Sequence, residues 1–242
     1  MYYYEIAILR SPLNNLTYQS EDKIDIGTKV LIKLRQRKVL DEAVVIKEVE
    51  KPTFECTNIS EITNEFFDEK MLQISTFVSQ YYVCSLGEAL SVYNPFDKEL
   101  KGSFEEKIFD SKIELSPFQK KAKEFLDSKK QALLFANTGA GKTEIYIKII
   151  EEHLNKNQQA LLLMPEISLT PQMQKRLEKV FGKCVAIWHS KITKKRKDEI
   201  LKGLQNGDIR LVAGARSALF LPYTDLGVMV VDEEHDDSYK SD

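Results

Sequence analysis

The octapeptide Ala136-Asn-Thr-Gly-Ala-Gly-Lys-Thr143 follows a predicted strand at 131–135 and opens a predicted helix at 141–154. Small residues at such a junction let backbone N–H groups turn towards phosphate oxygens, and the helix N-terminus adds partial positive charge. Ala136 stands where the strict phosphate-loop pattern has glycine, so that pattern is missed by one residue. The junction predicts a phosphate-binding loop, and the alternative is an ordinary strand-to-helix turn.

Within such a loop each residue type has a defined task. The ammonium group of Lys142 reaches the β- and γ-phosphates of a nucleoside triphosphate, and the hydroxyl of Thr143 ligates Mg²⁺. We expect the other loop residues to contact the cofactor as well, namely Thr138, Gly139, Ala140, Gly141 and Glu144.

An acidic motif, Asp232-Glu-Glu-His235, ends the apolar run 227–231. Phosphoryl transfer needs a carboxylate near Mg²⁺ and a second group that orients the attacking water. Asp232 suits the first role, as a magnesium ligand, and Glu233 suits the second. His235 is a candidate sensor of the phosphate state. Alone this motif would be a solvated loop, but after a phosphate loop it predicts a catalytic site with Lys142, Asp232, Glu233 and His235.

The surroundings of both motifs predict an α/β fold with a mainly parallel sheet. Near-continuous apolar runs suit strands that are buried on both faces. These runs alternate with helical segments: strands at 131–135, 160–164, 184–188, 209–213 and 227–231, and helices at 117–129, 141–154, 171–181 and 194–205. We therefore expect residues 115–242 to form one nucleotide-binding lobe.

The N-terminal part has a different pattern. Apolar and alternating runs predict strands at 2–9, 30–34 and 42–49, and Asp68 is a candidate N-cap for a helix. We expect a small β-rich, barrel-like domain at 1–95. The charged, patternless stretch 96–114 is interpreted as a linker.

The composition indicates a soluble globular protein, 43% hydrophobic and 30% charged, with a formal net charge of −2. No apolar run approaches the ~20 residues that span a bilayer, and the start lacks a signal-peptide pattern. These features predict a cytoplasmic location and no membrane partner. The three cysteines form no CxxC pair and are expected to be buried free thiols.

Two basic stretches leave their interpretation open. Lys29, Lys33, Arg35 and Arg37 share one face of a predicted strand, so a DNA-backbone contact and a solvated strand face both remain possible. The run Lys191-Ile-Thr-Lys-Lys-Arg-Lys197 begins a predicted helix, and a solvated surface is the favoured interpretation.

Several motifs occur together in the order typical of superfamily 2 helicases of the DExH type. They lie at 138–146, 164–172, 188–190, 214–222 and 232–236. The ordered set resembles the PriA family of primosomal replication-restart DNA helicases, most densely from about 115 to 240. The resemblance implies a RecA-like ATP-binding lobe with ATP and Mg²⁺ as cofactors.

The resemblance also implies site residues and partners. Gln119 would read adenine, and the loops carrying Pro165, Glu166, Arg216 and Ser217 would contact single-stranded DNA. The activity would be 3′-to-5′ unwinding in replication restart, on DNA forks and single strands. Primosome proteins and single-strand-binding protein would be partners. The family's N-terminal domain grips a 3′ DNA end, although Thr17 stands where that pattern usually has an acidic residue.

The family places a second lobe with arginine fingers, and a zinc module, in later parts of its sequence. An arginine finger contributes roughly 10³–10⁵ to turnover in related motors. We therefore expect these 242 residues alone to bind ATP·Mg²⁺ weakly and to have little ATPase activity. Two alternatives remain: another superfamily 2 translocase of the recombination or restriction type, and a non-hydrolysing adaptor lobe.

Overall fold

The computed structural model describes residues 1–34, 39–100, 102, 104, 107–137 and 139–239. The chain divides into two compact units, which are described separately. The first contains Met1–Lys101 with Phe220–Pro222, and the second contains Gly102–Leu219 with Tyr223–Asp242.

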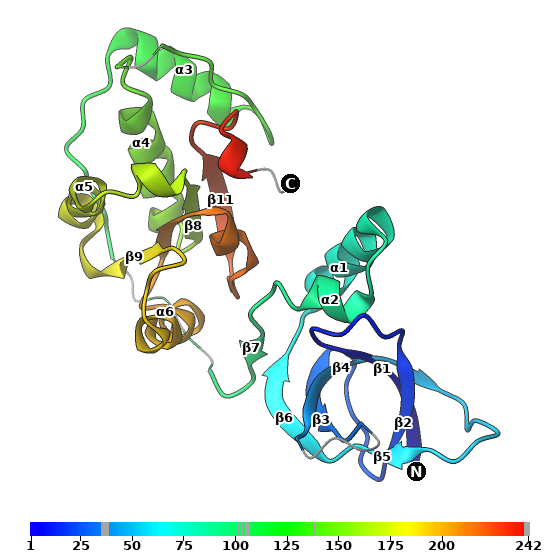
Figure 1. Cartoon of the computed structure of the whole chain (residues 1–242). Coiled ribbons are helices and arrows are strands. Elements are labelled where there is room, and N and C mark those ends of the chain that lie inside the picture. Colours follow the sequence, from blue (N-terminus) through cyan, green and yellow to red (C-terminus); the bar gives the residue numbers. More distant parts are fainter. Residues whose placement is uncertain (35–38, 101, 103, 105–106, 138, 240–242) are drawn as a thin grey trace. The chain divides into compact units, whose positions relative to one another are not determined.

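The first unit is built on a curled, mixed sheet of seven strands, which confirms the predicted β-rich fold (Figure 1). The strands follow the order β5-β2-β1-β4-β3-β6-β7, with antiparallel neighbours except for the parallel pair β2 and β5. Their bounds are β1 Tyr2–Ile8, β2 Leu16–Ser20, β3 Thr28–Ile32, β4 Asp41–Val49, β5 Thr57–Asn58, β6 Glu61–Phe66 and β7 Phe96–Asp97.

Alternation along β1 gives this sheet two apolar faces. Tyr4, Ile6 and Ile8 contribute to one buried cluster, whereas Ala7 contributes to the other. The second cluster includes Phe67 and side chains from α1 (Glu69–Tyr82) and α2 (Leu86–Leu90). The sheet therefore buries residues on both faces.

Two helix starts in this unit follow from capping chemistry. Asp68 accepts a hydrogen bond from the Met71 N–H and caps α1, as the sequence predicts. Ser85 and Glu88 form a reciprocal capping box at α2. Gly87 lets α2 approach β1 closely, because a Cβ there would lie 1.8 Å from the Ile8 carbonyl oxygen.

Both interpretations left open for Lys29, a DNA-backbone contact and a solvated strand face, are wrong. Its side chain is only 12% exposed, and its ammonium group lies 2.6 Å from carboxylates of Glu42 and Glu65. These partners come from the neighbouring strands β4 and β6. Burial lowers the pKa of Lys29, but the two carboxylates outweigh that effect and raise it overall.

The second unit contains a four-stranded parallel sheet in the order β11-β8-β10-β9, as expected for a RecA-like lobe (Figure 1). The strands are β8 Gln159–Leu163, β9 Val185–Trp188, β10 Leu211–Gly214 and β11 Leu226–Val231. The helices are α3 Pro117–Asp127, α4 Lys142–Asn155, α5 Pro171–Phe181 and α6 Lys194–Asn206. Both ends of each of these four helices lie within two residues of the predicted ends. Short 3₁₀ turns follow β8 at Glu166–Ser168 and β10 at Arg216–Phe220.

One sheet face is covered by α4 and α5. The core on this side includes Ile150 of α4, Phe181 of α5 and Leu162 of β8. It also includes Phe109, which lies in the stretch interpreted as a linker. Part of that stretch therefore packs on the second unit, while β7 pairs with β6 in the first.

The strand predicted at 131–135 does not form in the structure. Leu133 is 69% exposed and Phe135 is 92% exposed, although the run is as apolar as the buried strands. Strand structure requires a hydrogen-bonded neighbour, which local sequence cannot provide. Within the described residues, β11 is consequently an edge strand of the sheet.

No helix in the described part of the chain combines the length and apolar character needed to cross a membrane.

Candidate active site

The phosphate loop is shaped by two glycines with positive φ. Gly139 has φ +82° and Gly141 has φ +83°, values that favour glycine. A Cβ on Gly139 would meet no atom within 4 Å, so the loop borders open space. Gly141 is the N-cap of α4, and the helix N-terminus follows it directly. The arrangement suits an anion placed at this helix start.

The phosphate loop and the acidic motif meet in space. The Lys142 ammonium group lies 3.0 Å from a carboxylate oxygen of Glu233. Glu233 has φ +48°, an unusual backbone conformation for a non-glycine residue. Its second carboxylate oxygen lies 3.7 Å from Nε2 of His235, whose side chain is largely exposed. Lys142, Glu233 and His235 are therefore brought together, although the loop and the acidic motif are far apart in sequence.

Asp232 is positioned by two tyrosines. The Tyr146 hydroxyl donates to Oδ1 of Asp232 over 3.2 Å, and the Tyr239 hydroxyl donates to its backbone carbonyl over 2.9 Å. Burial, followed by the charge of Asp232, raises the pKa of both tyrosines. Both phenols consequently stay protonated and act as donors over the physiological pH range.

Gln119 lies against the phosphate loop. Its amide nitrogen donates to the Gly141 carbonyl over 3.1 Å, and its amide oxygen accepts from the Ser116 N–H over 2.8 Å. A Cβ on Gly141 would lie only 2.2 Å from the Gln119 amide nitrogen. Both ends of the amide are thus engaged, and pairing with adenine would replace one or both of these bonds.

The remaining loop residues have different surroundings. Thr143 is half-buried in the first turn of α4, whereas Ala140 is exposed. The carboxylate of Glu144 pairs with Arg176 of α5 at 2.5 Å. Thr138 lies outside the described residues.

A magnesium ion fits this donor set. Within the described ranges, no group of three or more His, Cys, Asp or Glu side chains is placed to hold a metal ion. Mg²⁺ is commonly bound through one or two protein oxygens together with waters and substrate phosphates, so a protein-only cage is not required. The hydroxyl of Thr143 and the carboxylate of Asp232 supply oxygens of the kind that Mg²⁺ prefers.

The loops after β8 and β9 are joined by a hydrogen bond. The Ser190 hydroxyl donates to the Glu166 carboxylate over 2.9 Å, and the Ser190 N–H donates to the same oxygen. These bonds lower the pKa of Glu166. Glu166 is exposed, whereas Pro165 is buried. A single DNA strand bound at this loop would therefore contact Glu166 and backbone atoms more directly than the Pro165 ring.

The loop after β10 forms hydrogen bonds with Trp188 of β9 and with Tyr239. The Trp188 indole N–H of β9 donates to the Ser217 hydroxyl over 3.2 Å. The exposed Arg216 donates to the Tyr239 carbonyl over 3.4 Å. Tyr239 in turn holds Asp232, so a chain of hydrogen bonds links this loop to the acidic motif.

In the first unit, Lys33 is exposed and lies just beyond the end of β3. The Tyr18 hydroxyl donates to its carbonyl oxygen over 3.1 Å. Arg35 and Arg37 lie outside the described residues.

Sequence reasoning missed the two tyrosines that hold Asp232. Tyr146 lies four residues after Lys142 in α4, and this spacing places both on one helix face. The spacing was an available signal for Tyr146. Tyr239 reaches Asp232 through a 3₁₀ turn at Asp237–Tyr239, which no pattern in the sequence indicated.

Comparison with known proteins accounts for both units. Residues 116–241 match the DEAD/DEAH box helicase family. Residues 5–95 match a 3′ DNA-binding domain (3′BD).

The chain is also similar to replication restart protein PriA of several bacteria. It is 44% identical to the Helicobacter pylori (strain J99) protein over 242 residues, covering all of this chain and 38% of that protein. It is 37% identical to the Rickettsia felis protein over 235 residues, 90% of this chain and 35% of that protein. It is 47% identical to the Bacillus subtilis protein over 116 residues, 48% of this chain and 14% of that protein.

The chain thus spans little more than a third of the length of the Helicobacter pylori and Rickettsia felis proteins. The helicase match covers slightly more than half of the chain and includes both the phosphate loop and the acidic motif. These matches confirm the resemblance inferred from the ordered motifs. The chain therefore belongs to the DEAD/DEAH box helicase family.

Proposed function

We propose that this chain forms the ATP-binding and DNA-binding part of an ATP-dependent 3′-to-5′ DNA helicase that acts in replication restart and primosome assembly. The contact between Lys142 and Glu233 at 3.0 Å carries the proposal, because it joins the two motifs that ATP hydrolysis requires. The match of residues 5–95 to a 3′ DNA-binding domain supports the DNA part.

The geometry suggests how nucleotide binding changes the site. In the structure, the ammonium group of Lys142 neutralises Glu233. The β- and γ-phosphates would attract Lys142 more strongly than one carboxylate does, and Glu233 would then be free to orient a water. Mg²⁺, held by Thr143 and Asp232, would neutralise developing charge on the phosphates. Tyr146 keeps the Asp232 carboxylate in place for this task.

The other assigned roles complete the proposal. Gln119 would read adenine with its amide, and the loop residues Thr138, Gly139, Ala140 and Gly141 would line the phosphates. Glu166, Arg216 and Ser217, from loops at the carboxyl ends of β8 and β10, would contact single-stranded DNA. The hydrogen bond from Arg216 to Tyr239 supports coupling between DNA and the nucleotide site.

The remaining roles concern the whole protein. DNA forks and single strands would be its substrates, and primosome proteins and single-strand-binding protein its partners, in the cytoplasm. The domain division would be 1–95 for the DNA-binding domain and 115–242 for the first helicase lobe, with 96–114 between them, of which the part around Phe109 packs on the lobe. Lys33, Arg35 and Arg37 would add DNA contacts from the first domain.

Nucleotide binding by the 242-residue chain tests the proposal directly. A fluorescent ATP analogue is titrated with and without Mg²⁺ into wild type, Lys142→Ala and Lys156→Ala. Lys156 is an exposed lysine at the other end of α4 and provides the matched control. We expect weak binding by wild type and Lys156→Ala and none by Lys142→Ala. Equal binding by all three proteins would refute the assignment of the phosphate loop.

Hydrolysis separates a motor from a non-hydrolysing adaptor. The chain, extended to the full length of its PriA relatives, is assayed for ATPase activity with and without single-stranded DNA. We expect stimulation by DNA that Glu233→Gln abolishes. A full-length protein that binds ATP but hydrolyses none with DNA present would favour the adaptor.

A further inference from the structure

Helix α3 carries Gln119 but contributes no buried residue to the lobe. None of the residues 117–127, all of which the structure describes, is buried, whereas α4 places Ile150 and Leu154 in the core. Phe118 is 88% exposed and Phe125 is 56% exposed. Burial of apolar surface is the main force that holds a helix in a fold. The orientation of α3, and with it the position of Gln119, therefore depends strongly on polar contacts.

Two polar contacts join α3 to α4. The Gln119 amide nitrogen donates to the carbonyl of Gly141, the N-cap of α4, over 3.1 Å. Further along both helices, the Lys123 ammonium group lies 2.6 Å from a carboxylate oxygen of Glu152. Gln119 and Lys123 are four residues apart, a spacing that places both on one face of a helix. This face of α3 is the one that contacts α4.

The two contacts are well separated on α4. Eleven positions lie between Gly141 and Glu152 in the numbering, which corresponds to about 16 Å along a helix axis. A single contact at Gln119 would let α3 pivot about that point, whereas a second, distant contact also fixes the angle between the helices. The contact with Glu152 therefore sets the direction in which α3 presents Gln119.

The surroundings of Lys123 suit this anchoring role. Its side chain is only 12% exposed, and its ammonium group also contacts Asp127 of the same helix at 2.7 Å. Burial lowers the pKa of Lys123, but hydrogen bonds to Asp127 and Glu152 outweigh that effect and raise it overall. Lys123 therefore stays charged over the physiological pH range. Partly buried ion pairs are also screened by salt less than exposed ones.

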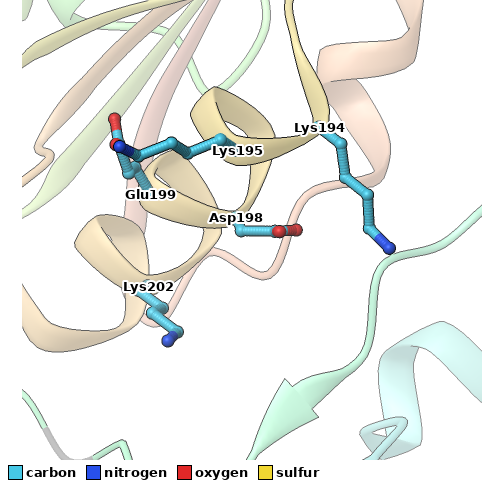
Figure 2. Close-up of a pocket in the computed structure, with 5 residues that line it drawn as sticks. All are labelled: Lys194, Lys195, Asp198, Glu199 and Lys202. Atoms are coloured by element: carbon cyan, nitrogen blue, oxygen red, sulfur yellow. The ribbon is translucent and has the colours of Figure 1, made fainter.

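The charged residues of α6 are arranged differently. Five of them line a surface hollow of about 420 Å³ (Figure 2): Lys194, Lys195, Asp198, Glu199 and Lys202. All five are exposed, and for Lys194 and Lys195 this agrees with the solvated surface favoured for the run 191–197. Glu199 pairs with Arg196 of the same helix. An ion pair within one helix fixes no second element, whereas the pair of Lys123 and Glu152 joins two helices.

The contact with Glu152 gains importance once adenine is bound. In the structure both ends of the Gln119 amide are engaged, by Gly141 and by Ser116. Pairing with N6 and N7 of adenine needs the amide oxygen and the amide nitrogen together, so Gln119 would release Gly141. The ion pair between Lys123 and Glu152 would then remain to hold α3 on α4.

We propose that Lys123 is a positioning residue for adenine recognition, whose ion pair with Glu152 holds α3 so that the Gln119 amide meets the edge of the base. The proposal rests on the proposed function, because it requires that Gln119 reads adenine. Lys123 itself makes no contact with the nucleotide in this role. Its effect is therefore expected in the choice between bases and not in the contacts of the phosphate loop.

Competition binding by the 242-residue chain tests this role. ATP and GTP each displace a ribose-labelled fluorescent ATP analogue, with Mg²⁺ present, from wild type, Gln119→Ala, Lys123→Met and Lys123→Arg. Guanine has an acceptor at O6 where adenine has its N6 donor, so the ratio of the ATP and GTP affinities measures the Gln119 contact. A bidentate contact of this kind contributes about 5- to 150-fold to such a ratio.

We expect Gln119→Ala to abolish the preference for ATP. Lys123→Met should lower the ratio by about threefold or more, through weaker ATP binding, because the bidentate contact is then formed only part of the time. Lys123→Arg should keep most of the preference, since a guanidinium group can also pair with Glu152. Glu152→Ala should act like Lys123→Met, with no further loss in the double variant.

Two variants serve as matched controls. Lys120→Met removes an exposed lysine from the same helix. Asp127→Asn removes the partner that Lys123 has within α3 but leaves its partner on α4. Both controls should keep the wild-type ratio. Unchanged circular dichroism and Trp188 fluorescence verify that every variant folds.

The possible outcomes are distinguishable. If wild type does not prefer ATP, or if Gln119→Ala keeps the preference, the adenine part of the proposed function fails and the role of Lys123 fails with it. If the preference depends on Gln119 but survives in Lys123→Met and Glu152→Ala, the role of Lys123 is refuted while the proposed function stands. Equal losses of ATP and GTP affinity in Lys123→Met, or a lower ratio in Asp127→Asn, would mean that Lys123 only stabilises its helix, which also refutes the role.

Discussion

Phe109→Ala tests whether the segment before α3 is part of the helicase lobe. Phe109 is 4% exposed, and its ring lies 5.9 Å from that of Phe181 in the core under α4 and α5. Its ring also covers the guanidinium of the buried Arg210, at 5.4 Å. Removing a buried phenylalanine ring costs roughly 3–5 kcal/mol, a large share of the ~5–15 kcal/mol that stabilises a domain.

Urea denaturation followed by tryptophan fluorescence measures this loss. The chain has one tryptophan, and Trp188 is buried in the second unit, so its emission reports on that unit alone. With a urea dependence of about 2 kcal/mol per molar, the midpoint should fall by roughly 1.5–2.5 M. Circular dichroism at low urea verifies that the variant starts folded.

Ile108→Ala is the matched control, because Ile108 is the preceding residue and is 91% exposed. We expect its free energy of unfolding to stay within about 0.5 kcal/mol of wild type, as for other surface substitutions. Asn155→Ala extends the test, because Asn155 bonds both the N–H and the carbonyl of Phe109, at 2.8 and 3.0 Å. Equal midpoints for Phe109→Ala and Ile108→Ala would show that the segment is a linker after all.

Two further substitutions probe the site and the first unit. Tyr146→Phe keeps the ring but removes the hydroxyl that donates to Asp232; we expect Mg²⁺-dependent nucleotide affinity to fall by about 0.5–1.5 kcal/mol. Titration at several Mg²⁺ concentrations checks this, and an unchanged Mg²⁺ dependence would remove Tyr146 from the site. Gly87→Ala places a Cβ 1.8 Å from the Ile8 carbonyl oxygen, so we expect a markedly lower melting temperature of the first unit by circular dichroism. A wild-type melting curve would mean that α2 can move away from β1 at little cost.

The sequence predicted those elements whose signals are local and periodic. Helix α5 begins at its predicted residue because Thr170 caps it and Pro171 occupies its first turn. It ends at its predicted residue before Gly182, which has positive φ. The strands β8, β9 and β10 were predicted because both of their faces are apolar. By contrast, β2 and β6 carry mostly polar residues, and their sequences resemble loops. Their strand structure comes from pairing with β1 and β3.

Two errors share one physical origin. Lys29 was predicted either to contact DNA or to be solvated because its charge is visible in the sequence, whereas the partner carboxylates Glu42 and Glu65 come from other strands. The run 131–135 was assigned to the sheet because it is apolar, whereas strand formation also needs an available neighbour. Residue type indicates which interactions a segment can make. Contacts with residues far away in the sequence decide which of those interactions form.

At the candidate site, the sequence indicated what each motif can bind but not how the two motifs contact each other. Each motif indicated its chemistry separately, since Lys142 in its loop suits phosphates and Asp232-Glu233 suits a metal and a water. Neither motif indicated that Lys142 pairs with Glu233. This contact balances the charge of the two groups, since the ammonium group and the carboxylate neutralise each other. Under the proposed function, a triphosphate in the phosphate loop would draw Lys142 away from Glu233, so the same event would release the carboxylate that we assign to the attacking water.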